Sequence, residues 1–183
     1  MRERLKAEQI SSIKEQKIFI DANVWLYIHC SIGNFHRETV SVYSNVYRYV
    51  LRENMEVYTD IIIISELINR YLRIALTNYQ TKSDQENIGF KEYRMTEDGM
   101  ISTREVYSIL QNKILPFTII INFSYDNESI KKLFDDRSSD IDFNDSHIVK
   151  LCAENGFYLM THDGDFKDED INIISHNETF FIN

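Results

Sequence analysis

The sequence predicts an α/β protein whose central parallel sheet is covered by helices on both faces. Short apolar segments typical of strands alternate with longer segments in which apolar residues recur at helical spacing. Strands separated by helices need crossover connections, which make the strands parallel and bury the sheet between helices. Sites in such sheets form at the carboxyl ends of the strands, so the residues after each strand are the first candidates.

The expected strands are short and rich in isoleucine, valine, phenylalanine and tyrosine. They cover residues 17–20, 55–59, 116–123, 157–161 and 171–175. The segment PFTIIINF, at 116–123, is expected to be a buried strand because its residues are almost all apolar. The sequence shows no internal repeat, so we treat residues 1–183 as a single domain.

The expected helices carry apolar residues at intervals of three and four positions. They cover residues 22–31, 36–52, 60–79, about 100–114, 127–136 and about 142–155. The helix that begins near Asp60 has one apolar stripe, formed by Ile61, Ile64, Ile68, Tyr71, Leu72 and Ala75. The segment 80–98 is polar, and we expect a loop or surface insertion there.

Composition narrows the class and location of the protein. A net charge of −9 argues against a protein that coats nucleic acid, but a nuclease with a local, carboxylate-rich site stays compatible with it. No apolar run approaches the roughly 18 residues that span a bilayer, and the charged N-terminus lacks a signal core. Cys30 and Cys152 lie in apolar surroundings and show neither a CxxC nor a Cys/His spacing. Both cysteines are therefore expected to be reduced. We therefore expect a cytoplasmic protein without membrane association.

Carboxylates follow two of the expected strands. Asp21 comes directly after the strand at 17–20, and Asp163 follows the strand at 157–161, with Asp165 close behind. Taken alone, Asp21 is equally well explained as a helix cap, and the other two as turn residues. Because parallel strands end at one edge of a sheet, these acids are also candidates for one shared site.

Two further acids lie at the start of the helix at 142–155. Asp145 lies three and four positions before Ile148 and Val149, so it extends the buried face of this helix. Asp142 lies on the same line, and one or both acids could simply cap the helix. A carboxylate on a buried face is costly unless it is paired or bound to a metal ion.

Glu66 is a weaker candidate when judged by spacing alone. It points away from the apolar stripe of its helix and shares its side with Arg70 and Arg73. That spacing favours a solvated Glu–Arg pair. Several acids aimed at one edge would repel one another without a cation, however, and oxygen-only ligands suit Mg²⁺ or Mn²⁺ rather than zinc.

Three segments carry a recognisable pattern in a recognisable order. FIDANVWLY has a strand followed by Asp, a small residue and Asn, and IISELINR has a Ser and a Glu on a helix. DFNDSHIVKLCAENGFYLMTHDGDF has a helix-starting Asp, an apolar helix, a turn, a strand and then Thr-x-Asp-x-Asp-Phe. Together these segments resemble the PIN-domain ribonucleases, a family that includes the VapC-type toxins of toxin–antitoxin pairs.

The resemblance implies a PIN-like three-layer α/β/α fold with a central parallel sheet of four to five strands. It also implies an endoribonuclease that uses Mg²⁺ or Mn²⁺ to hydrolyse RNA phosphodiester bonds. Its catalytic and metal-binding acids would be Asp21, Glu66, Asp145 and Asp163. Accessory roles fall to Asp142, Asp165, Asn23, Ser65 and Thr161. Apart from the resemblance, the candidates for phosphate contact in the substrate are Arg70, Arg73, Arg94 and Arg104, and surface solvation is the alternative for each.

The resemblance also implies partners. RNA is the expected substrate, and an antitoxin or another regulatory protein would restrain the nuclease. Homodimers are common in the family, and the tyrosine-rich helix at 36–52 could form one, although core packing explains that helix equally well. The stretch from 80 to 140 is longer than in compact toxins and matches no family motif.

Other functions stay open. One alternative is a PIN-fold interaction module without significant catalysis, and another is an RNA-processing nuclease outside toxin–antitoxin systems. A metal-dependent phosphatase of another α/β family is less favoured, because no Asp-x-Asp pair follows the first strand.

Overall fold

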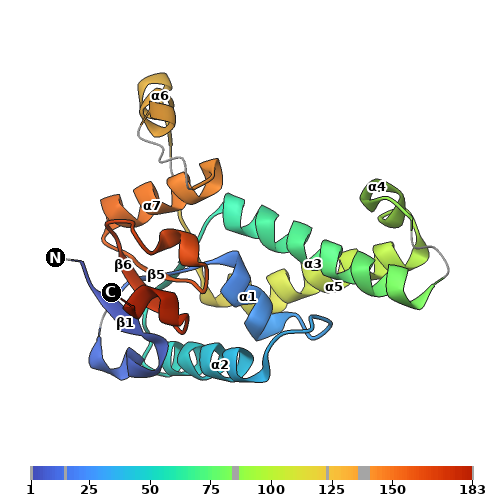
Figure 1. Cartoon of the computed structure of the whole chain (residues 1–183), viewed down its shortest axis with the longest axis horizontal. Helices are drawn as coiled ribbons and strands as arrows, with labels where there is room; N and C mark the ends of the chain where they lie inside the picture. The colour runs from blue at the N-terminus through green and yellow to red at the C-terminus, as the bar shows by residue number, and fades with distance from the viewer. Residues whose placement is uncertain (1, 15, 84–86, 123, 136–140, 183) are drawn as a thin grey trace.

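The computed structural model describes residues 2–14, 16–83, 87–122, 124–135 and 141–182. Within these residues, six strands form one parallel sheet with the order β1-β6-β5-β2-β3-β4 (Figure 1). The strands are β1 (Arg4–Lys6), β2 (Ile18–Ile20), β3 (Val57–Thr59), β4 (Ile119–Ile120), β5 (Tyr158–Met160) and β6 (Asn172–Ser175). Helices flank the sheet, so the predicted α/β/α architecture is confirmed.

The sheet is larger than the predicted four to five strands because β1 adds a parallel strand beside β6. The sequence of β1, RLK, has one apolar residue, which is too little for a strand pattern. The prediction of a buried strand at 116–123 is wrong, since β4 is a two-residue edge strand. Ile119 and Ile120 pair with β3 but are 46% and 50% exposed.

All of the predicted helices are present. Their observed ends lie within three residues of the predicted ends, provided that the π turn at Leu110–Ile114 is counted as part of the helix that precedes it. The helices are α1 (Ala22–His29), α2 (Arg37–Arg52), α3 (Ile61–Lys82), α4 (Phe90–Tyr93), α5 (Glu97–Ile109), α6 (Asn127–Asp135) and α7 (Phe143–Asn155). Short 3-10 segments cover Ala7–Ser12, Leu115–Phe117, Gly164–Phe166 and Glu178–Phe181, and the π turn covers Leu110–Ile114. Of the helices described, none combines the length and the apolar character that crossing a membrane would require.

The segment 80–98, expected as a polar loop, is partly helical. α3 continues to Lys82, the one-turn α4 follows, and α5 begins at Glu97. α5 packs along α3, and a small second core of Ala75, Ile88 and Tyr93 joins α4 to them. The far half of α3, together with α4 and α5, projects away from the sheet (Figure 1). We call this projection the α3–α5 arm (residues 73–83 and 87–109).

The first turns of α3 bury a different face from the predicted stripe. Ile63 and Leu67 lie in the core, whereas Ile61, which the stripe included, is 72% exposed. Four consecutive isoleucines at 61–64 carry no periodic signal, so packing against α1 and the sheet decides which of them is buried. From Tyr71 onward the predicted stripe is confirmed.

A buried hydrogen-bonded chain joins the start of α3 to α7. Asp60 caps α3 by accepting a backbone N–H through Oδ1 at 2.9 Å, and its Oδ2 lies 2.5 Å from Nε2 of His147. Nδ1 of His147 lies 2.6 Å from the hydroxyl of Tyr125. The chain therefore fixes the helix that carries Glu66 against the helix that carries Asp145.

We expect Asp60→Ala to lower the free energy of unfolding by about 3 kcal/mol, because it removes a helix cap together with one half of a buried pair. Urea unfolding measures the loss. Asp126→Ala is the matched control, since Asp126 accepts the Ser129 N–H at 2.7 Å in the first turn of α6 but is fully exposed. The control should lose less, and equal losses in the two variants would contradict a stabilising role for the buried pair.

Candidate active site at the carboxyl edge of the sheet

Asp21 lies where β2 ends and α1 begins, near the middle of the sheet. Its N–H donates to the carbonyl of Met160, which continues the pairing of β2 with β5. The side chain is 4% exposed and makes no side-chain cap to α1, so capping does not explain it. Its Oδ2 accepts hydrogen bonds from the hydroxyl of Thr161 at 2.6 Å and the amide of Asn23 at 2.7 Å.

Asn23 and Thr161 connect Asp21 to the residues that follow β5. The buried hydroxyl of Thr161 also accepts the N–H of Asp163 at 3.0 Å. The side-chain carbonyl of Asn23 accepts the N–H of His162 at 3.3 Å. These bonds hold the ends of β2 and β5 together and orient the carboxylate of Asp21. Asn23 and Thr161 therefore lie where their predicted role, the support of a site carboxylate, needs them.

Glu66 lies on the second turn of α3, and its side chain is 19% exposed. Its Oε1 lies 2.9 Å from Nε of Arg70, so the predicted i,i+4 pair exists. Burial raises the pKa of Glu66, Arg70 lowers it, and the charges of Asp21, Asp142 and Asp163 raise it further. The pair therefore borders the other acids, and Arg70 acts as an internal counter-ion for the group.

Asp142 and Asp145 lie at the amino end of α7. Asp142 caps the helix, and its Oδ1 accepts the N–H of Asp145 at 3.0 Å. Burial raises the pKa of Asp145 to about 7, and the charges of Asp142, Asp21, Asp163 and Glu66 raise it in the same direction. A carboxyl group that titrates near neutral pH is a common mark of a functional site.

Asp163 follows β5 and accepts the N–H of Asp165 at 3.2 Å, which begins a short 3-10 turn. Its charge raises the pKa values of Asp21, Glu66 and Asp145. Asp165 is exposed, and its charge is not among the main causes of these shifts. The structure thus brings Asp163 into the group and leaves Asp165 outside it.

Two other predicted residues also lie outside the group. Ser65 is exposed, and within the described residues its hydroxyl makes no hydrogen bond to the acids. Arg73 lies further along α3 than Arg70, with its guanidinium 4.8 Å from the ring centroid of Phe90 in α4. Neither residue supports the carboxylates directly.

Aromatic residues beside the acids were not predicted as part of the site. The hydroxyl of Tyr43 donates to the carbonyl of Thr161 at 2.9 Å and lies 3.1 Å from Nδ1 of His162. Tyr27 packs edge-on against the His162 ring. Burial raises the pKa of its hydroxyl, Arg70 lowers it, and the charges of Asp21 and Asp163 raise it. Tyr27 and Tyr43 follow ordinary helical spacing, so no sequence signal separates them from core residues.

Comparison with known families agrees with this arrangement. A family model described as "PIN domain" matches residues 18–171, which include every acid of the group. The chain belongs to the PIN-domain family. PIN domains are generally nucleases, and the nucleases among them generally use divalent metal ions.

The PIN fold of the chain is also shared with a solved structure. FitAcB from Neisseria gonorrhoeae matches with a TM-score of 0.54 and 17% sequence identity, over 86% of this chain and 96% of that chain. At this level of identity the likeness shows the fold alone. No curated protein matches the chain.

The carboxylates of this PIN domain fit a hard divalent cation by their chemistry. Their donors are all oxygens, and burial raises the pKa values of Asp21, Glu66 and Asp145. A divalent cation would relieve the repulsion among them. Among the described residues, no group of three or more His, Cys, Asp or Glu side chains is positioned to hold a metal ion. The fit therefore rests on donor type and shared charge, not on a preformed coordination geometry.

The raised pKa of Asp145 predicts a pH dependence of stability. Its folded-state pKa of about 7 exceeds the ordinary value of 3.8, so the folded protein binds this proton more tightly than the unfolded chain does. The stability from this proton is complete below about pH 4 and is lost as the pH rises through 7.

In EDTA, Asp145→Asn should therefore raise Tm at pH 8, and the gain should shrink as the pH falls toward 4. Each kcal/mol of repulsion removed corresponds to about 2–4 °C in Tm. Calorimetry across this pH range measures the difference, with Glu154→Gln at the exposed end of the same helix as the control. Identical pH profiles for the parent protein and Asp145→Asn would contradict the prediction.

Proposed function

We propose that this PIN protein is a Mg²⁺- or Mn²⁺-dependent endoribonuclease that hydrolyses RNA phosphodiester bonds. Its catalytic and metal-binding acids would be Asp21, Glu66, Asp145 and Asp163. The observation that carries the proposal is electrostatic coupling at one edge of the sheet: beside the larger effect of burial, the charges of acids from four segments of the chain raise the pKa values of Asp21, Glu66 and Asp145. Membership of a family of nucleases supports it.

The proposal gives roles to the bound metal ion and to Asp21, Arg70 and Asp145. A divalent ion bound among the acids would lower the pKa of water and stabilise negative charge on a phosphate. Both side-chain hydrogen bonds to Asp21 go to Oδ2, which leaves Oδ1 to meet a ligand. Arg70 would move from Glu66 to the phosphate of the substrate. Without a metal ion the pKa of Asp145 is about 7, and a divalent ion bound among the acids would lower it, so that Asp145 would serve as a carboxylate ligand.

Cleavage assays with the acid variants test the site. Asp21→Asn, Glu66→Gln and Asp145→Asn should each lower RNA cleavage in Mg²⁺ or Mn²⁺ by about 100-fold or more. Glu154→Gln should keep the parental rate, since Glu154 lies at the far end of α7 and pairs with Lys150 at 3.4 Å. Parental cleavage by any of the three acid variants would remove that residue from the site.

We propose that the narrower role is that of a cytoplasmic toxin held in check by an antitoxin or another regulatory protein. The resemblance to VapC-type toxins supports this role, and the free, buried Cys30 and Cys152 suit a reducing compartment. Growth arrest on expression of the parent protein, but not of Asp145→Asn, is the expected result. Cleavage without growth arrest would favour an RNA-processing nuclease. Tyr43 and Tyr47 of α2 are buried, so a homodimer would need other residues of that helix.

A PIN-fold interaction module without catalysis is the second candidate, because no metal-binding group is preformed among the described residues. Thermal melts in EDTA, Mg²⁺ and Mn²⁺ separate the two. A metal-dependent nuclease should gain Tm with Mn²⁺, by an amount set by the concentration relative to Kd, and Asp145→Asn should lose that gain. Unchanged melts in both proteins would favour the interaction module.

A further inference from the structure

Four basic side chains gather on the α3–α5 arm without carboxylate partners. Arg73, Lys91, Arg94 and Arg104 take part in none of the ion pairs found among the described residues. The same arm also carries Glu92, Glu97, Asp98 and Glu105, so these cations stand out by their lack of carboxylate partners and not by a large net charge of the arm. Unpaired cations on a projecting element favour an anionic ligand.

Two of these cations are held by one aromatic ring. The guanidinium groups of Arg73 on α3 and Arg94 beside α4 lie 4.8 Å and 6.0 Å from the ring centroid of Phe90. Stacking on the ring orders the planar groups before any ligand arrives, so less conformational freedom is lost when they bind phosphate.

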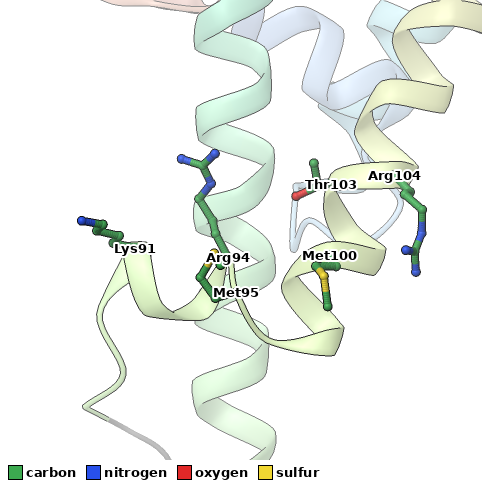
Figure 2. A pocket seen from close by; sticks show the side chains of 6 residues that line it. All are labelled: Lys91, Arg94, Met95, Met100, Thr103 and Arg104. Atoms are coloured by element: carbon green, nitrogen blue, oxygen red, sulfur yellow. The ribbon is translucent and has the colours of Figure 1, made fainter.

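A cavity of about 450 Å³ lies next to this stack, between α4 and α5 (Figure 2). The residues that line it are Lys91, Arg94, Met95, Met100, Thr103 and Arg104. Figure 2 shows Met95 beside Arg94 just after α4, and Met100 on the first turn of α5 with Arg104 one turn further along that helix. Among the described residues, this lining combines an apolar surface with three cations and contains no acid, which suits a base and its phosphates.

A line of basic side chains begins beside the proposed catalytic site and runs along α3 to the cavity. Glu66, Arg70 and Arg73 follow one another at i, i+4 and i+7, so they share one face of α3 and span about 10 Å of its axis. Arg70 contacts Glu66, Arg73 contacts Phe90, and the same ring contacts Arg94 at the mouth of the cavity.

We propose that single-stranded RNA bound at the carboxylates continues along this face of α3 to the cavity between α4 and α5. The arginines would bind its phosphates, and Met95 and Met100 would contact a base. This inference rests on the proposed function. RNA fits better than an acidic protein, because the cavity lining sets the apolar surface of Met95 and Met100 beside cations, which suits a base next to its phosphates, whereas an acidic peptide offers charge without a base.

RNA length provides the test. A stacked strand advances about 3.4 Å per nucleotide, so a trinucleotide covers about 10 Å and a 12-nucleotide RNA about 40 Å. Binding of both labelled, mixed-sequence RNAs to the unsubstituted full chain is measured by fluorescence anisotropy in Ca²⁺, a hard cation that takes the same oxygen ligands, in place of Mg²⁺. The longer RNA should bind at least about tenfold more tightly.

Charge reversal on two separate helices locates the contacts. Arg94→Glu and Arg104→Glu should each weaken binding of the longer RNA several-fold and reduce the slope of log Kd against log salt by about 0.7 for each phosphate that the variant no longer binds. The control is Arg48→Glu on α2, where the exposed Arg48 only bonds to Asn45 at 2.6 Å. Thermal melts confirm that each variant is folded.

Each outcome decides for or against the inference. Equal affinity for both RNAs, or losses no larger than that of Arg48→Glu, would overturn it. Competition by a polyglutamate peptide as effective as that by the longer RNA would assign the arm to an acidic protein instead. Cleavage of the 12-nucleotide RNA by the unsubstituted protein is scored separately. Cleavage without length-dependent binding would defeat only the inference, and length-dependent binding without cleavage would defeat only the nuclease proposal.

Discussion

Mutual repulsion between a buried carboxylate and several less buried ones beside it is the constraint around which this end of the molecule is built. Asp21, Glu66, Asp142, Asp145 and Asp163 come from four segments of the chain, and their charges raise the pKa values of Glu66 and Asp145. Burying like charges is unfavourable unless hydrogen bonds, counter-ions or a metal ion offset it. The surroundings provide hydrogen-bond donors to Asp21, a guanidinium beside Glu66 and a helix amino end beneath the two acids of α7.

The fold resists this repulsion with links between the elements that carry the acids. Thr161 and Asn23 tie the end of β2 to the end of β5. The Asp60–His147 pair ties α3 to α7 in a separate, buried place. A site assembled from strand ends and helix starts needs such links, because no single element is long enough to hold all of its side chains in place.

α3 connects the carboxylate group at the edge of the sheet with the α3–α5 arm. Its first turns contribute Glu66 and Arg70 to the carboxylate group, and its far half supports the α3–α5 arm. α5 packs along this far half and also reaches the main core through Val106, so α3 and α5 link the arm to the body of the domain.

Local sequence determined much of the fold and part of the site. Alternating strand and helix patterns determine a parallel sheet, and the carboxyl ends of its strands select Asp21 and Asp163 as candidates. Helix phase selects Asp145. The prediction of the fold is confirmed because strand and helix patterns have periods of two and 3.6 residues, which short segments express by themselves, whereas the assignment of the site residues stays a prediction.

Long-range packing decided the rest. β1 and β4 are too short to show a pattern, and the phase of α3 is hidden in four consecutive isoleucines. Spacing alone assigns Glu66 to a solvated face, yet the fold turns that face toward the acids of α7 and β5. The Asp60–His147 pair and the stack of Arg73 and Arg94 on Phe90 join residues far apart in sequence or across a turn. Such contacts depend on how elements meet in space, and no local period records that.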